Sequence, residues 1–207
     1  EMVRRTVLDY SRAGAAALHL EDQVFPKRCG HLDGKRLIPL DHAVEKIAAA
    51  VKAARDDDKR FVICARTDAR GVEGFDAAVA RAKAYIRAGA DMIFPEGLTT
   101  EKEFGDFATV VRNAHPRVWL LANMTEFGKT PMITAERFAE LGYNCVIYPV
   151  TLLRVAMGAV TRALARLKAD GSAQGLLDQM QTREQLYSTI GYTPGVEWEC
   201  PAREGPR

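Results

Sequence analysis

Short apolar runs alternate along the chain with longer stretches in which apolar residues recur every three or four positions. The apolar runs cover residues 16–20, 60–65, 91–94, 118–122 and 144–148. They are nearly continuous and rich in branched side chains, which is typical of parallel strands buried on both faces. The sequence therefore predicts five strands of a parallel sheet.

The stretches between these runs have the period of amphipathic helices. Residues 41–55 and 75–88 each place their apolar side chains on one face, and Asp41 is expected to be the N-cap of the first helix. Thr100 with Glu103 predicts a capping box before a short helix.

Further boundary signals mark where helices begin and end. Thr134 is expected to cap a helix over residues 135–141. Gly14, Gly89 and Gly142 each stand between a predicted helix and the next strand. Glycine is favoured there because the helix-ending residue often takes a positive φ.

Alternating strands and helices predict the α/β class with a parallel sheet. Two architectures fit this pattern, an open, doubly wound sheet and a (β/α)8 barrel. No GxGxxG follows the first strand, which disfavours a doubly wound sheet that binds a dinucleotide. Each predicted strand is followed by polar groups, which are Glu21 and Asp22, Arg66 to Asp68, Glu96, Asn123, and Tyr148. Polar groups at successive strand ends favour the barrel, because a barrel builds its active site there. Five strands are too few to close one.

After Pro149 the pattern becomes helical. Helices are predicted over residues 151–169 and 174–190, and the tail over 193–207 is expected to be irregular. We therefore expect a partial barrel over residues 1–170 with an active-site loop at 25–38, a C-terminal helical extension over 171–192, and the tail.

Charge and cysteine content narrow the classes of partner. The 29 basic and 27 acidic residues give a net charge of +2, and no basic block stands out, so a nucleic acid or membrane partner is not expected. No apolar run approaches the roughly 20 residues that cross a bilayer. The four cysteines show neither disulfide nor CxxC spacing, so a reducing, cytoplasmic setting is expected.

Cys29 lies among cations in the segment 27–31, Lys-Arg-Cys-Gly-His. Lys27 and Arg28 favour the thiolate form, and the same cations could bind substrate carboxylates. Gly30 lets the backbone approach a ligand closely, and His31 adds a possible cation. The alternative is a basic loop with an incidental cysteine.

Carboxylates at the predicted strand ends could bind a hard cation. Glu21 with Asp22 suits Mg²⁺, which takes oxygen ligands, and Glu96 could complete the oxygen shell from another strand. Alternatively, one of the first two caps a turn or pairs with Lys27 or Arg28, and Glu96 is a solvated loop carboxylate.

Four further positions are candidates for binding substrate. Arg66 ends a buried strand and offers a planar fork for a carboxylate, unless it pairs with Asp68 or Glu96. Asn123 and Thr125 could donate hydrogen bonds, although such residues more often make turns. Arg154 lies early in a helix, where a solvated face is the commoner explanation.

Together these segments resemble the isocitrate lyase/PEP mutase superfamily. The resemblance rests on residues 18–23 (Leu-His-Leu-Glu-Asp-Gln), 27–31, 65–69, 94–96, 123–128, 148–149, Arg154 and 180–183, and covers residues 10–192 in order. Within the superfamily, the Lys-Arg-Cys-Gly-His loop resembles that of the lyases that cleave carbon–carbon bonds. The segment 123–128 (Asn-Met-Thr-Glu-Phe-Gly) and the compact spacing resemble the 2-methylisocitrate lyases.

The resemblance implies a Mg²⁺-dependent (β/α)8 barrel, usually a homotetramer that exchanges C-terminal helices between subunits. It implies retro-aldol-type cleavage of a 2-hydroxy tricarboxylate, such as 2-methylisocitrate to pyruvate and succinate. Cys29 would protonate the departing carbanion. Glu21 and Glu96 would join the metal's ligand or water shell. Substrate would be held by Gly30, His31, Arg66, Asn123, Thr125 and Arg154, with Lys27, Arg28 and Glu96 beside it.

One departure from the family pattern stands out. Family members carry roughly three more strand–helix units before the position of Glu1, including an Asp-x-Asp segment that supplies the principal metal ligands. Either the chain is part of a longer protein, or the numbering covers only its ordered or retained part. We expect the 207 residues alone to be inactive and poorly folded. A dimethylmalate or other substituted-malate lyase remains an alternative substrate class, and a non-catalytic fragment that acts in oligomerisation is an alternative of another kind.

Overall fold

Five parallel strands form one sheet in the computed structural model, which describes residues 1–57 and 60–196. The strands are β1 (Ala17–Glu21), β2 (Val62–Thr67), β3 (Met92–Pro95), β4 (Trp119–Asn123) and β5 (Cys145–Ile147). They are hydrogen-bonded in the order β1-β2-β3-β4-β5, and each neighbouring pair is parallel. The five predicted strands are confirmed. The first four lie one or two residues further toward the C-terminus than predicted, and β5 is one residue shorter at each end.

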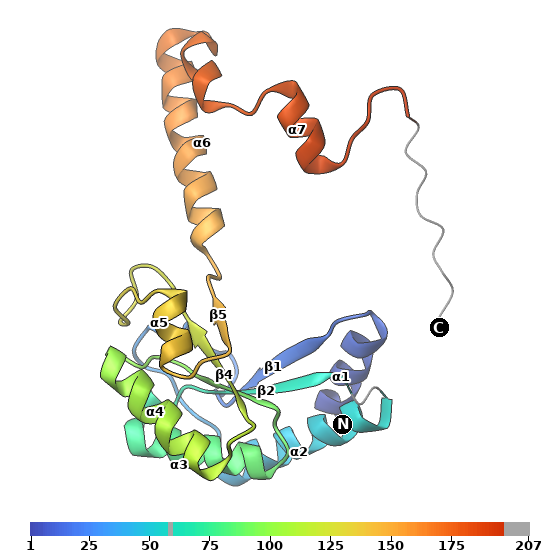
Figure 1. Cartoon of the computed structure of the whole chain (residues 1–207), viewed down its shortest axis with the longest axis vertical. Helices are drawn as coiled ribbons and strands as arrows, with labels where there is room; N and C mark the ends of the chain where they lie inside the picture. The colour runs from blue at the N-terminus through green and yellow to red at the C-terminus, as the bar shows by residue number, and fades with distance from the viewer. Residues whose placement is uncertain (58–59, 197–207) are drawn as a thin grey trace. The chain divides into compact units, whose positions relative to one another are not determined.

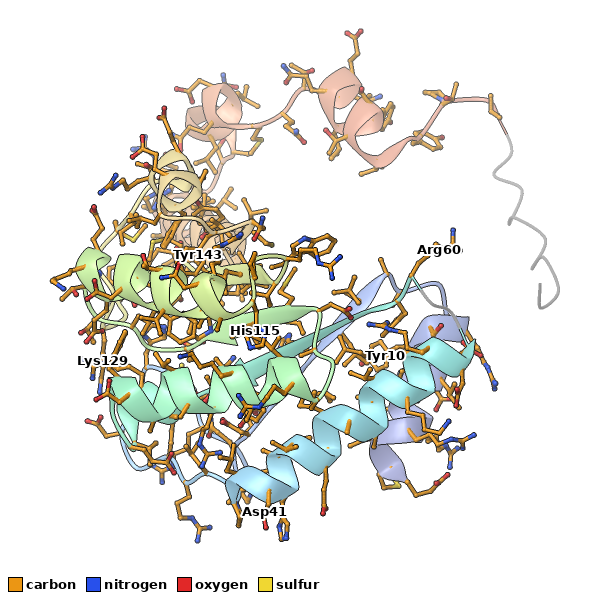
Figure 2. The ribbon with its side chains drawn as sticks, turned by 60° about the horizontal axis from the view of Figure 1, so that its bottom comes forward. Tyr10, Asp41, Arg60, His115, Lys129 and Tyr143 are labelled. Atoms are coloured by element: carbon orange, nitrogen blue, oxygen red, sulfur yellow. The ribbon has the colours of Figure 1, made fainter. Side chains whose placement is uncertain are left out.

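Helices connect successive strands and cover one face of the sheet (Figure 1). They are α2 (Leu40–Asp57), α3 (Phe75–Arg87), α4 (Glu101–Ala114) and α5 (Ala135–Glu140), with the short 3₁₀ helix η1 (Ala69–Gly71) before α3. A further helix, α1 (Met2–Arg12), precedes β1 and packs against α2. Figure 2 shows α2 and α3 side by side across this face.

The strand order distinguishes between the two predicted architectures. A doubly wound sheet reverses its strand order at a switch point and carries helices on both faces. Here the order follows the sequence without reversal, and right-handed crossovers then place every connecting helix on the same side. The curved five-stranded sheet is therefore an arc of a (β/α) barrel, as predicted.

The main core lies between the sheet and its helices. Because strand side chains alternate between faces, Ala65, Ile93 and Leu120 point outward to the helices, where they meet Tyr85 and Phe107. A smaller cluster around Val7 joins α1 to α2 and to the first two strands.

The alternate positions of the strands face the inside of the arc. Cys64, Phe94 and Leu121 form an apolar layer there, with Cys145 and Ile147 beside them. The next inward-facing positions, toward the C-terminal ends of the strands, are polar. The C-terminal edge of the arc is therefore where chemistry can be placed.

Helix boundaries follow most of the predicted signals. Thr100 and Thr134 accept hydrogen bonds from backbone N–H groups at the starts of α4 and α5. The prediction for Asp41 was wrong, because α2 begins at Leu40 and Asp41 lies within its first turn. The capping box at Thr100 is incomplete, because it lacks the hydrogen bond from the Thr100 backbone N–H to the Glu103 side chain. That side chain instead accepts hydrogen bonds from Thr99 and Arg70. Its helix is also longer than predicted.

The predicted positive φ values at the helix ends are confirmed. Gly14, Gly89 and Gly142 have φ of 89°, 101° and 92°. Side chains with a Cβ rarely adopt this conformation, which explains glycine at these three equivalent turns.

The chain divides into two compact units, Glu1–Leu152 and Leu153–Arg207. Helix α6 (Thr151–Asp170) leads into the second unit, which also contains the 3₁₀ helix η2 (Gln174–Gln179) and α7 (Arg183–Ile190). The predicted continuous helix over 174–190 was wrong. It is broken because Thr182 and Gln185 form a reciprocal capping box that starts a new helix.

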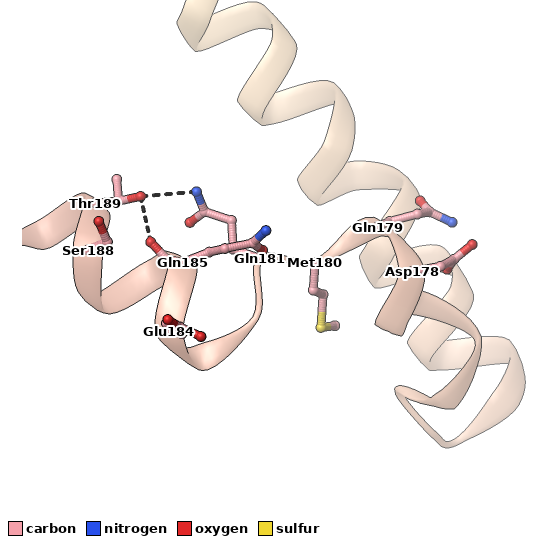
Figure 3. Close-up of a pocket in the computed structure, with 8 residues that line it drawn as sticks. All are labelled: Asp178, Gln179, Met180, Gln181, Glu184, Gln185, Ser188 and Thr189. Atoms are coloured by element: carbon pink, nitrogen blue, oxygen red, sulfur yellow. Dashed lines mark hydrogen bonds between the residues drawn. The ribbon is translucent and has the colours of Figure 1, made fainter.

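Other predictions about the second unit stay open. The barrel boundary at residue 170 and the extension over 171–192 stay predictions, and residues 197–207 of the predicted tail lie outside the described residues. A hollow in this unit is bordered by the end of η2 and one side of α7, where Gln181 donates to Thr189 (Figure 3). Its lining contains none of the predicted site residues. Within the described residues, no helix is long and apolar enough to cross a membrane.

Candidate active site

Glu96 lies at the centre of a polar cluster on the C-terminal edge of the arc. It directly follows β3 and is 2% exposed. Its Oε1 lies 3.0 Å from Nε2 of His31, and its Oε2 lies 3.3 Å from a terminal nitrogen of Arg66 and accepts a hydrogen bond of 3.2 Å from Asn123. Burial alone would raise the pKa of Glu96, but His31 and Arg66 outweigh burial and hold it below the usual value.

Arg66 is buried in β2 and faces three carboxylates. Its Nε donates to Asp68 over 2.9 Å and lies 3.4 Å from Glu21, and a terminal nitrogen approaches Glu96. Its guanidinium carbon lies 4.8 Å from the ring centre of Phe94. Burial opposes the charged form, yet these carboxylates raise the pKa of Arg66 above its usual value. The alternative interpretation, a buried pair with Asp68 or Glu96, is therefore what the structure contains.

The segment with Cys29 lies in a loop whose two ends are tied together. Val24 donates to the carbonyl of Arg36, Ile38 donates to that of Asp22, and Gln23 forms a bridge with Leu37. The loop is thus closed at its base by short antiparallel pairing. The buried Gln23 side chain also bonds both the N–H and the C=O of Arg28 at 2.9 Å, which fixes the loop one residue before Cys29.

Two glycines allow this loop to touch the cluster. A Cβ at Gly30 would overlap the side chain of Glu96 and come within 2.8 Å of Arg66. A Cβ at Gly128 would lie 2.7 Å from Nδ1 of His31. The backbone of the loop therefore rests directly on the two buried charged groups, and only glycine fits at residue 30 without displacement.

Glu21 is the last residue of β1 and points into the same cluster. Its Oε2 lies 3.1 Å from Nζ of Lys27 and 3.4 Å from Nε of Arg66. Although both cations are near, this buried oxygen has no partner in hydrogen-bond geometry. Pairing with Lys27, the alternative given above for Glu21, is thus present.

The remaining predicted residues are less closely joined to the cluster. Cys29, Lys27 and Arg28 are exposed in the loop, and Arg28 donates to the carbonyl of Asp33. Thr125 is half-buried after β4. Arg154 belongs to the second compact unit, so its role in the site stays a prediction.

Asp22 does not join Glu21 in the cluster. Consecutive strand residues point to opposite faces, and Asp22 is buried on the helix side. Its carboxylate accepts from the Thr67 hydroxyl, the Asp68 N–H and the Tyr85 hydroxyl at 2.8–2.9 Å. These bonds occupy its oxygens, so the idea of a Glu21–Asp22 cation pair was wrong for Asp22.

Sequence reasoning did not identify two residues that shape the cluster. Asp68 was considered only as an alternative partner, but its bidentate contact orients Arg66. The backbone N–H of Lys129 donates to Nδ1 of His31 over 3.1 Å. The Thr-Asp that follows Arg66 could have indicated the contact between Asp68 and Arg66. No local signal indicates the contact between Lys129 and His31.

The cluster combines a buried guanidinium with carboxylates and with unpartnered polar atoms. Besides Oε2 of Glu21, the buried Oδ1 of Asn123 and Nε2 of His31 have no partner in hydrogen-bond geometry. Buried polar atoms without partners are rare in folded proteins, and a bound ligand is one explanation for them. Two of the three are oxygens, which is the donor type that a hard cation takes.

The described residues do not supply a full metal site by themselves. Within 1–57 and 60–196, no group of three or more His, Cys, Asp or Glu side chains is placed to hold a metal ion. Oε2 of Glu21, which has no hydrogen-bond partner, suits a divalent cation that takes further oxygens from water or substrate, whereas both oxygens of Glu96 already have partners.

The strand order, with a polar cluster and a loop gathered at the C-terminal edge, is the architecture of part of a (β/α) barrel. The family model described as phosphoenolpyruvate phosphomutase matches residues 1–168. The chain belongs to this family, in agreement with the superfamily resemblance.

Lyases are among the proteins that the chain resembles. A probable 2-methylisocitrate lyase 1 of Corynebacterium glutamicum is 58% identical over 188 residues, which are 91% of this chain and 60% of the relative. A crystal structure of 2,3-dimethylmalate lyase superposes with a TM-score of 0.82 at 40% identity, over 92% of this chain and 61% of that one.

A third relative has a known ligand. Phosphonopyruvate hydrolase, in a complex with oxalate and Mg²⁺, has a TM-score of 0.76 at 31% identity, over 91% of this chain and 63% of that one. The chain spans about 60% of the length of the curated relatives that it matches.

Proposed function

We propose that the protein containing this chain is a carbon–carbon lyase that cleaves 2-methylisocitrate into pyruvate and succinate. The observation that supports the proposal is the close packing of Gly30 on the buried side chains of Glu96 and Arg66, with Cys29 and His31 as its neighbours in the chain. The similarity to the Corynebacterium glutamicum relative supports this substrate.

Cations around the cluster suit a substrate with several carboxylates. Arg66, which Asp68 and Glu96 hold in place, is proposed to bind one substrate carboxylate from this buried position. Lys27 and Arg28 lie exposed on the loop above it. Asn123, Thr125 and Arg154 are proposed to hold the remaining carboxylate.

Cys29 is proposed to move the proton. When the carbon–carbon bond breaks, the hydroxyl group loses its proton and becomes the carbonyl of the 2-oxo acid, and the bonding pair passes to the neighbouring carbon. The Cys29 thiol protonates that carbon, and the resulting thiolate takes up the proton that the hydroxyl released. Its exposed position on a loop anchored at both sides is compatible with reaching a substrate.

A Mg²⁺ ion is the proposed cofactor. Glu21 and Glu96 would hold it, directly or through water, and the unpartnered Glu21 oxygen supports this assignment. Bound there, the ion would withdraw charge from the hydroxyl and carboxylate that become the 2-oxo acid. The Mg²⁺ complex of the related phosphonopyruvate hydrolase is consistent with this choice.

A homotetramer that exchanges C-terminal helices is the proposed assembly. The second unit contains apolar side chains that remain exposed, which are Leu153, Val155, Met157, Val160, Leu164, Leu186 and Ile190. Apolar surface of this extent usually marks a protein–protein contact. A single-subunit mass from light scattering would contradict this assembly.

The deciding experiment measures products from 2-methylisocitrate, isocitrate and dimethylmalate with Mg²⁺, using protein expressed from the complete coding sequence. We expect pyruvate and succinate from the first, and little turnover of the others. Comparable activity on isocitrate would contradict the substrate assignment. Cys29→Ser should retain substrate binding and lose most turnover.

A dimethylmalate lyase is the second candidate, favoured by the 40% identical crystal structure of that enzyme. Preferential turnover of dimethylmalate in the same assay would establish it. Absence of activity on all three substrates, with a folded oligomer, would instead favour the non-catalytic oligomerisation partner.

A further inference from the structure

Lys35 is a buried cation in the loop that contains Cys29. Its residue is 8% exposed, and its Nζ donates a hydrogen bond to the carbonyl oxygen of Gly30. Within the described part of the chain, it forms no ion pair, and the nearby Asp33 pairs with Lys129 instead. Burying an ammonium group without a carboxylate is unfavourable. A lysine is therefore expected at this position only if its ammonium group has a role there that offsets the cost of burying it.

The space for this ammonium group is provided by Gly71, at the end of η1. A Cβ on Gly71 would lie 2.9 Å from Nζ of Lys35 and 3.4 Å from its Cε. Gly71 is not among the residues with positive φ, so glycine is needed here for space rather than for backbone conformation. Lys35 thereby connects the loop to the segment that follows β2.

Gly30 is consequently held from two sides. Its Cα faces Glu96 and Arg66, and its carbonyl oxygen faces Lys35. That oxygen also lies 3.7 Å from the position of a Cβ at Gly97. Fixing this peptide fixes the two neighbouring residues, which are Cys29 and His31.

We propose that Lys35 is a positioning residue that seats the Cys29-Gly30-His31 segment on the buried cluster, and that Gly71 is glycine to admit its ammonium group. The catalytic part of this inference rests on the proposed function, because it assumes that Cys29 transfers a proton. The seating itself does not depend on that assumption.

The position of the Cys29-Gly30-His31 segment can be monitored at Lys129, which lies outside the loop. The N–H of Lys129 donates to His31, so its exchange with solvent deuterium is slow only while His31 is in place. The variants to compare are Lys35→Met, Gly71→Ala and the double variant. Lys102→Met is the matched control, because Lys102 is exposed and its ion-pair partner among the described residues is Asp106, one turn away.

We expect Lys35→Met to speed exchange at Lys129 about tenfold or more, with no change in Lys102→Met. Gly71→Ala should act in the same direction. The double variant should equal the stronger single variant, because both act through one ammonium group. Exchange at wild-type rate in Lys35→Met, or full additivity in the double variant, would overturn the seating role.

Steady-state kinetics distinguishes a positioning role of Lys35 in catalysis from a purely structural one. Lys35→Met should lower kcat roughly 10- to 100-fold, since misplacement by about 1 Å has effects of that size, with KM nearly unchanged. Unaltered kcat despite faster exchange would refute the catalytic part. If the wild-type protein has no lyase activity, the proposed function fails, while the exchange data still decide whether Lys35 seats the loop.

Discussion

The imidazole of His31 faces the carboxylate of Glu96, with Nε2 3.0 Å from Oε1. Its other nitrogen, Nδ1, accepts a hydrogen bond from the backbone N–H of Lys129. These two contacts fix the orientation of the ring between the Glu96 carboxylate and the backbone of Lys129. The contacts of Glu96 with His31 and Arg66 hold its pKa below the usual value.

The first prediction concerns the charge of Glu96. Its pKa in the folded protein is below the usual 4.5, so its carboxylate stabilises the fold above that value, and the contribution is lost as pH falls through the folded pKa. Glu96→Gln should lower the free energy of unfolding by ~2 kcal/mol at pH 7. Urea unfolding in the presence of a chelator measures this difference.

The same titration provides the check. The difference between wild type and Glu96→Gln should shrink progressively as the pH falls below 4.5 and the carboxyl of Glu96 takes up its proton. A difference that stays constant over that range would show that Glu96 contributes through packing rather than charge.

The second prediction concerns the close approach of Gly30. Gly30→Ala should lower kcat/KM by roughly 100-fold, because a Cβ overlaps Glu96 and must push the loop off the cluster. Gly158→Ala in α6 is the matched control, since its Cβ would meet only the flexible end of Arg162. Equal activity of the two variants would contradict the packing of Gly30 against the cluster.

The regular part of the fold could be predicted from the sequence because its signals are local. Apolar runs indicated the strands, and Gly14, Gly89 and Gly142 indicated the turns between helices and strands. The order of polar residues at the strand ends indicated the barrel edge. The failure at residues 174–190 was a missed local signal, the Thr182–Gln185 capping box.

The contacts within the site could be predicted less well, because they join residues far apart in the chain. Asp22 and Tyr85 are 63 positions apart, and Lys129 reaches His31 across 98. Whether Glu21 faces the cluster and Asp22 the helices depends on strand register, which was predicted one residue too early. The space beside Gly71 has no signature in the sequence at all.

The third prediction concerns the buried carboxylate of Asp22. Asp22→Ala should reduce the free energy of unfolding by ~3 kcal/mol, since it leaves buried donors from Thr67, Asp68 and Tyr85 without an acceptor. Asp106→Ala, which removes an exposed pair with Lys102, should cost under about 0.5 kcal/mol. Urea unfolding measures both variants. Similar losses in the free energy of unfolding would refute the role of Asp22 as the acceptor for these three buried donors.

The fourth prediction concerns thiol reactivity. Cys29 is exposed on its loop, whereas Cys64 is buried on the inner face of β2, where burial raises the pKa of its thiol to about 12. Only the thiolate reacts with iodoacetamide, and at pH 8 roughly one Cys64 thiol in ten thousand is ionised.

Alkylation at pH 8, followed by peptide mass spectrometry, should therefore modify Cys29 well before Cys64. In 6 M urea the difference should disappear, because unfolding exposes Cys64 and returns its pKa to the usual range. Oxalate added before alkylation should slow modification of Cys29 if its thiol lies beside the binding cluster, and leave the slow reaction of Cys64 unchanged. Equal rates at Cys29 with and without oxalate, at a concentration that raises the unfolding temperature, would place that thiol away from the bound anion and contradict its proposed role in proton transfer.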